Sequence, residues 1–121
     1  MPPPRFNMNE PDRIRVQHML DAAKEALSFV SGQSREDLAS DRKLALAIIK
    51  EIEIIGEAAA RISEETKSLS SAVPWPAIIS IRNRLIHGYA DIDLDIVWSA
   101  VKVDLPKLIG DMKAVLAADI Q

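Results

Sequence analysis

The 121-residue sequence has no cysteine, only two histidines and few aromatic residues. The absence of cysteine excludes disulfides and thiolate metal sites. His18 and His87 lie far apart in the sequence on different predicted helices, so a histidine-based zinc site is not expected, and no metal or cofactor is predicted. Aromatic residues make up 4% of the chain. The core must therefore consist mainly of Ile, Leu, Val and Ala, which favours helix-on-helix packing.

Long apolar runs are also missing. No stretch approaches the roughly 20 residues that span a bilayer, and residues 1–7 lack the apolar segment of a signal peptide. We therefore expect a cytoplasmic protein without membrane contact. The formal net charge is −3, which excludes a broad basic face for nucleic acid. Any RNA would have to be held by a few local cations.

Apolar residues recur at helical spacing along most of the chain. A first helix is predicted over residues 11–30, a short helical turn over 34–38 and a second long helix over 41–62. Gly56 interrupts this second helix at a cost of about 1 kcal/mol relative to Ala. We expect another helix, from the same chain or from a second subunit, to approach closely there.

A polar linker is predicted over residues 63–71, followed by Val73-Pro74-Trp75-Pro76. The third helix should start at Pro76 and end at His87, because Gly88 is typical of the position just past a helix. The fourth should begin within residues 91–95, and Pro106 should kink it.

The carboxylates of Asp91, Asp93 and Asp95 resemble the start of a calcium loop. The glycine and the later glutamate of such a loop are missing, so a capped helix N-terminus is the better interpretation. The predicted fold class is all-α, an antiparallel up-and-down bundle of four main helices with room for one short extra helix. We expect one domain over residues 8–121, preceded by a disordered extension over 1–7.

The residues that could take part in a reaction are concentrated at the end of the third predicted helix. Two arginines, an asparagine, a histidine and the only tyrosine fall within eight residues, Arg82-Asn83-Arg84-Leu85-Ile86-His87-Gly88-Tyr89. Metal-free cleavage of RNA needs a group of near-neutral pKa to move the 2′-hydroxyl proton, and cations to hold the developing charge. Histidine and arginine supply these two parts.

Helix geometry places Asn83 and Arg84, four and three residues before His87, beside its imidazole. Arg82 lies five residues away, about 140° around the helix and about 7.5 Å along it. It reaches the same phosphate only if the helix ends there or a second chain contributes, which favours a symmetric dimer. Either Glu53 or Glu57 could pair with Arg82 or Arg84, although a solvated pair of Glu57 with Arg61 is the more common outcome.

A purely structural interpretation stands beside this one. Arginine and asparagine on helices are usually solvated, and a histidine at a helix C-terminus often serves as a cap. His18, within an apolar stripe, is expected to be a packing or surface residue.

The string from Ile81 to Tyr89 resembles the Arg-x4-His-x-Tyr signature of the HepT-like HEPN family. Three other segments agree with that family in the expected order: 51–58 on the second helix, 74–75 before the third and 93–98 after it. The resemblance spans nearly the whole chain from Met8.

The resemblance implies a dimeric α-helical bundle whose motifs face each other. It implies a metal-independent endoribonuclease toxin in which Arg82 and His87 are catalytic and Asn83 assists. Because Arg84 borders His87 on the helix, we also expect it to bind substrate. The resemblance also implies a cognate minimal nucleotidyltransferase antitoxin, which in some pairs transfers AMP onto the tyrosine that matches Tyr89. Two alternatives remain: a non-catalytic helical partner of such a nucleotidyltransferase, and a motif that serves only as a dimer-interface network.

Overall fold

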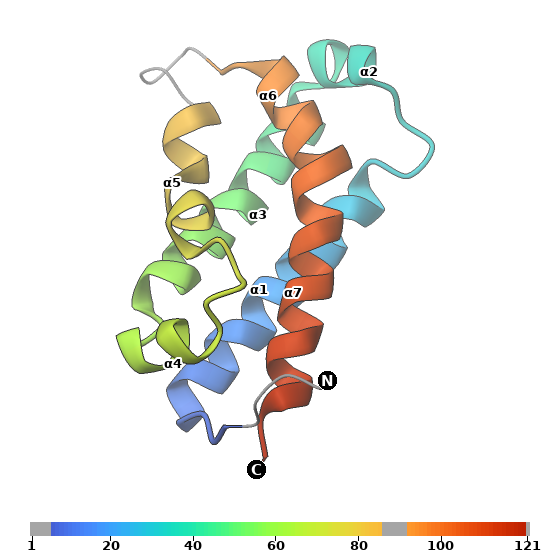
Figure 1. Ribbon diagram of the computed structural model, residues 1–121. Helices are drawn as coiled ribbons and strands as arrows, with labels where there is room; N and C mark the ends of the chain where they lie inside the picture. Colours follow the sequence, from blue (N-terminus) through green and yellow to red (C-terminus); the bar gives the residue numbers. More distant parts are fainter. Residues whose placement is uncertain (1–5, 86–91, 121) are drawn as a thin grey trace.

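A computed structural model describes residues 6–85 and 92–120, and most of these are helical. The helices form a bundle (Figure 1). This confirms the predicted all-α class and the short extra helix after the first long one. The bounds are α1 Glu10–Phe29, α2 Arg35–Ser40, α3 Arg42–Arg61, α4 Glu64–Leu69, α5 Trp75–Leu85, α6 Leu94–Ser99, the π-helical η1 Ala100–Asp104 and α7 Leu105–Ala118.

Polar side chains cap the helices at their starts. Asn9 caps α1, Asp41 caps α3 and Asp93 caps α6, in each case with a side-chain oxygen that accepts from a backbone amide of the first turn. Such caps satisfy amides that have no partner within the helix. The role of Asp93 confirms that the acidic segment before α6 is a helix N-terminus and not a calcium loop.

The linker predicted over residues 63–71 was wrong, because α4 (Glu64–Leu69) lies within it. Its six residues carry no apolar periodicity, so the sequence pattern missed it. A buried polar cluster fixes it instead: the hydroxyls of Ser63 and Thr66 both donate to Asp12 of α1. Burial would raise the pKa of Asp12, but these hydrogen bonds and a backbone one from Ser63 outweigh burial and hold the pKa below its ordinary value.

The fourth predicted helix adapts to Pro106 by widening its turn. α6, η1 and α7 follow one another without a break, and η1 ends just before the proline. Proline has no amide hydrogen to donate to the preceding turn. In η1 the amide of Leu105 donates to the carbonyl of Ala100, five residues back, which is the wider π-helical pattern.

α3 is the central helix, with α1 on one side and α5 on the other (Figure 1). A Cβ at Gly56 would lie 3.5 Å from the carbonyl oxygen of Ile79. The helix that approaches this glycine is therefore α5 of the same chain. The core side of α3 is formed by Ile48, Ile52 and Ile55, all of which are buried.

The two ends of the described chain meet. Phe6 is buried, its amide donates to the carbonyl of Ala118, and its carbonyl accepts from the amide of Ile120. Residues 1–5 of the extension expected over 1–7 lie outside the described part. Within that part, no helix is long and apolar enough to cross a membrane.

Candidate active site on helix α5

Local contacts at the start of α5 fix its orientation. Trp75 is buried, and its indole N–H donates to the carbonyl of Ser70 at 3.2 Å. Further along the helix Ile81 and Leu85, four residues apart, are buried against the core. These anchors decide where the three residues between them point.

Arg82 and Arg84 lie on opposite flanks of α5. Each residue turns about 100° around a helix. With Ile81 and Leu85 toward the core, Arg82 faces one side, Arg84 faces the other, and Asn83 points away from the core. All three are exposed. The structure therefore separates two arginines that adjoin the same predicted site.

On the α3 flank, Nε of Arg82 donates to Oε1 of Glu53 at 3.3 Å. The sequence left Glu53 and Glu57 open as partners, and the structure selects Glu53. The side chain of Arg82 is 52% exposed and that of Glu53 24%. Exposed ion pairs of this kind contribute only about 0–1 kcal/mol. Glu53 therefore orients Arg82, and breaking this ion pair to free Arg82 would cost little free energy.

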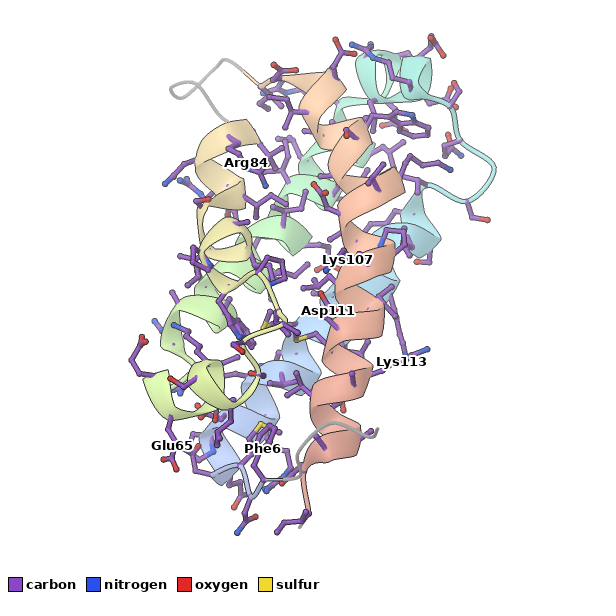
Figure 2. The ribbon with its side chains drawn as sticks, in the orientation of Figure 1. Phe6, Glu65, Arg84, Lys107, Asp111 and Lys113 are labelled. Carbon is purple, nitrogen blue, oxygen red and sulfur yellow. The ribbon has the colours of Figure 1, made fainter. Side chains whose placement is uncertain are left out.

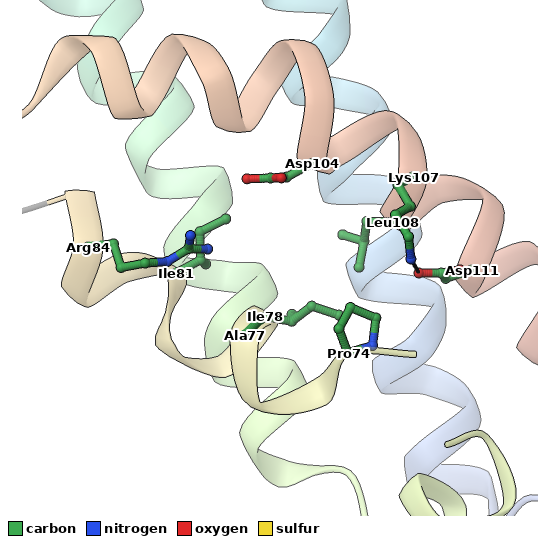
Figure 3. Close-up of a pocket in the computed structure, with 9 residues that line it drawn as sticks. All are labelled: Pro74, Ala77, Ile78, Ile81, Arg84, Asp104, Lys107, Leu108 and Asp111. Atoms are coloured by element: carbon green, nitrogen blue, oxygen red, sulfur yellow. Dashed lines mark hydrogen bonds and ion pairs between the residues drawn. The ribbon is translucent and has the colours of Figure 1, made fainter. Parts of the chain in front are cut away.

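On the α7 flank, a cavity of about 160 Å³ separates α5 from α7 (Figure 3). Apolar side chains line its inner wall, and below it a smaller void of about 30 Å³ reaches into the core beside Ile52 and Leu105. The apolar lining consists of Pro74, Ala77, Ile78, Ile81 and Leu108.

Charged side chains surround this cavity. Arg84 comes from α5, Asp104 from η1, and Lys107 and Asp111 from α7. Nζ of Lys107 lies 2.9 Å from Asp111, so these two neutralise each other. Within the described part of the chain, Arg84 and Asp104 have no ion pair or hydrogen bond. In the sequence nothing distinguished Asp104 from an ordinary solvated helix residue, apart from its position two residues before Pro106.

A second polar feature lies on the other side of α3. Burial, together with the neighbouring carboxyl of Glu25 on α1, raises the pKa of Glu51 to about 7. The Oε2 atom of Glu51 is buried and has no hydrogen-bond partner among the described residues. His18, also on α1, is exposed and lines a groove of about 440 Å³ between α1 and α3. Neither feature adjoins the flanks of α5 that carry Arg82 and Arg84.

His87 and Tyr89, and the predicted end of the third helix at His87, lie outside the described residues. The chain on either side of them is fixed: the carbonyl of Leu85 accepts from the amide of Asp93 at 2.9 Å. Leu85 and Asp93, which are described, therefore lie side by side at the end of α5 that bears Arg82 and Arg84. Figure 2 labels Arg84 at this end of the bundle, opposite Phe6.

The described residues thus form an all-α bundle with exposed arginines at the end of one helix. Comparison with known proteins identifies the family. The family described as "Ribonuclease HepT-like" matches residues 19–115. The chain belongs to this family, as the sequence motif predicted.

Curated relatives cover most of the chain. It is 36% identical over 95 residues to the "Probable ribonuclease HepT" of Thermococcus cleftensis, covering 75% of this chain and 86% of the relative. It is 33% identical over 104 residues to a protein of Caldanaerobacter subterraneus subsp. tengcongensis named "Putative RNase", covering 86% and 93%. No solved structure gives a significant match.

Proposed function

We propose that this chain is the toxin of a toxin–antitoxin pair and cleaves RNA without a metal ion. The observation that carries the proposal is the exposed guanidinium of Arg82, held by Glu53 at the end of α5 in a member of a ribonuclease family. Its exposed N–H groups are available to a phosphate, for which guanidinium is a favoured ligand.

In the proposed reaction, His87 takes the proton from a ribose 2′-hydroxyl. The 2′-oxygen bonds to the adjacent phosphorus, and the bond from phosphorus to the 5′-oxygen of the next nucleotide breaks. The products are a 2′,3′-cyclic phosphate and a 5′-hydroxyl. Arg82 stabilises the charge that develops on the phosphate oxygens, and Asn83 orients the site.

The site is proposed to be completed by a homodimer. A proton must reach the leaving 5′-oxygen while another leaves the 2′-hydroxyl, and a dimer with two α5 motifs about its axis would supply two imidazoles. The exposed positions of Arg82 and Asn83 are consistent with such an arrangement. Light scattering at micromolar concentration should give a dimer, and a monomer there would remove the composite site.

We propose that the activity is regulated by transfer of AMP to Tyr89, which a cognate minimal nucleotidyltransferase catalyses. The tyrosine oxygen would bond to the α-phosphorus of ATP, with release of pyrophosphate and of the phenolic proton. The added phosphate would then compete with RNA for the positive charges of Arg82 and Arg84. Mass spectrometry of the co-expressed pair should detect one added AMP, absent from Tyr89→Phe.

A second candidate function is a non-catalytic partner of the nucleotidyltransferase. Two observations favour it: the net charge of −3, which repels RNA, and the engagement of Arg82 with Glu53. In that case the protein would bind its partner normally and would cleave no RNA.

The deciding experiment measures cleavage of single-stranded RNA in the presence of excess EDTA. Wild-type protein should cleave, and His87→Ala should lose activity while its circular dichroism spectrum stays unchanged. Arg61→Ala, an exposed arginine at the far end of α3, is the matched control and should keep full activity. Absence of wild-type cleavage, or its dependence on added Mg²⁺, would contradict the proposal.

A further inference from the structure

The cavity between α5 and α7 carries two charged groups that the proposed cleavage does not use. Arg84 approaches it from α5 and Asp104 from η1, and Figure 3 shows both side chains directed toward the space between the helices. Neither has an ion pair or hydrogen bond within the described residues. By contrast, Lys107 and Asp111 on the same wall satisfy each other.

The size and lining of the cavity restrict what it can hold. Pockets for drug-sized ligands occupy about 300–1,000 Å³, whereas this one has about 160 Å³. It therefore suits a single flat ring system and not a whole nucleotide or a helix. The apolar side chains of Ile78, Ile81 and Leu108 would cover the face of such a ring, as apolar walls do in enzymes that grip a single base.

We propose that this cavity binds one guanine base of the RNA substrate, with Asp104 and Arg84 as the residues that select it. The proposal rests on the ribonuclease function proposed above and names the substrate's sequence preference. A carboxylate can accept two parallel hydrogen bonds, and a guanidinium can donate two. Guanine presents both matching pairs: the N1–H and N2–H donors on one edge, and the O6 and N7 acceptors on another.

The other bases match these two side chains less completely. Adenine and cytosine present a single amino group to a carboxylate, and uracil a single imino group, so each leaves one carboxylate oxygen without a donor. Asp104 is exposed in the free protein, but a bound base would cover it, and an acceptor that loses water without gaining a donor costs free energy. Guanine is therefore the base that satisfies Asp104 and Arg84 together.

The position of the cavity on α5 connects base selection to the cleavage site. Arg82 and Arg84 are two residues apart, about 3 Å along the helix axis, but they face opposite flanks. A strand that crosses the exposed side of α5 over Asn83 would present a phosphate to Arg82 and a neighbouring base to the α7 flank. Cleavage should then occur at a fixed distance from the bound guanine.

The first test sequences the fragment ends released from an RNA library of random sequence. Wild-type protein should prefer guanine at one fixed position relative to the cut. Asp104→Asn, which exchanges one acceptor oxygen for a donor at constant volume, should reduce that preference by about tenfold or more. Asp21→Asn, an exposed aspartate on α1, is the matched control and should retain the preference. A guanine preference that Asp104→Asn leaves intact, or no base preference in wild type, would overturn the proposal.

A binding experiment separates this proposal from the cleavage function. Guanosine, adenosine, cytidine and uridine monophosphates are titrated into the full chain and followed by NMR. Guanosine monophosphate should bind most tightly and shift signals of Ile78, Ile81 and Leu108, and both Asp104→Asn and the cavity-filling Ala77→Phe should weaken it about tenfold or more. This result would support the base site even if no RNA were cleaved. Equal binding of the four nucleotides, or equal binding by the variants, would overturn it even if cleavage were confirmed.

Discussion

α5 borders α3 on one flank and α7 on the other, and we call these two borders the α3 seam and the α7 seam. They differ in how closely the helices pack and in whether the charged side chains are paired. Toward α3 the helices approach so closely that a glycine, Gly56, stands against the carbonyl of Ile79, and the arginine on that side pairs with Glu53. Toward α7 a cavity of about 160 Å³ remains, and Arg84 and Asp104 face it without partners among the described residues.

The difference indicates which seam serves the fold and which serves a ligand. Close-packed apolar contacts contribute directly to stability, so the α3 seam holds α5 in position. The α7 seam lacks such close packing, and the opposite charges of Arg84 and Asp104 are not paired with each other. Arg84 and Asp104 are exposed at the edge of this cavity, so water solvates them in the free protein and a bound ligand can reach both.

The largest expected difference between the seams is in activity. Arg82→Ala should lower the rate of RNA cleavage by about 10²–10³-fold, the usual loss when one group that stabilises a transition state is removed. Arg84→Ala should lower the rate at guanine-selected sites by about tenfold and much less elsewhere, because it removes base recognition only. Single-turnover rates on two RNAs that differ in that one base measure both effects. If the two variants lost the same factor in cleavage rate on both RNAs, the two arginines would not have the different roles proposed here.

The buried carboxyl of Glu51, on the side of α3 that faces α1, should make the stability of the protein depend on pH. Glu51 has a pKa raised from 4.5 to about 7, so the folded state keeps a proton that the unfolded state has lost. Stability should therefore be full below about pH 4.5 and fall as the pH rises to about 7, by at most about 3 kcal/mol.

Urea unfolding at pH 5 and pH 8 tests this effect. The neutral variant Glu51→Gln should flatten the slope, while Glu57→Gln, exposed on the same helix, should leave it unchanged. The comparison stays above about pH 5 because Asp12, whose pKa is lowered, loses its contribution only as the pH falls through that lowered pKa. A wild-type stability that rises from pH 5 to pH 8 would contradict the assignment.

The closeness of the α3 seam can be tested at Gly56. A Cβ there would meet the carbonyl of Ile79 at 3.5 Å, an ordinary contact, so Gly56→Ala should fold normally. The longer side chain of Gly56→Leu would push α5 away from α3 and should cost about 1–3 kcal/mol of unfolding free energy. If both variants unfolded at the same urea concentration, the seam would be looser than described.

The smallest effect is expected at Gly110 on α7. Nothing lies within 4 Å of a Cβ at this position, so Gly110→Ala gains helix propensity without any new contact. It should stabilise the protein by about 0.5–1 kcal/mol and leave cleavage unchanged. A loss of stability in thermal unfolding would mean that this side of α7 is not free.

The sequence predicted those features that repeat along a helix or form a specific motif. The spacing of apolar residues located the long helices, the aspartates before α6 indicated its cap, and the motif that contains Arg82 indicated the family. α4 was missed because the residues that fix it bond to Asp12, 51 and 54 residues away in the sequence, and do not form a local pattern. Asp104 was missed because only the tertiary fold brings it to the cavity that Arg84 also lines.

The cleavage chemistry proposed for His87 and Arg82 determines which chemical groups the ends of the RNA fragments carry. Mass spectrometry of fragments produced in excess EDTA should find 2′,3′-cyclic phosphate, or the monophosphate that forms on its hydrolysis, opposite a 5′-hydroxyl. These ends result when the 2′-hydroxyl is the nucleophile, as the proposed roles of His87 and Arg82 require. Fragments with a 3′-hydroxyl and a 5′-phosphate, formed only after Mg²⁺ is added, would contradict the proposed chemistry.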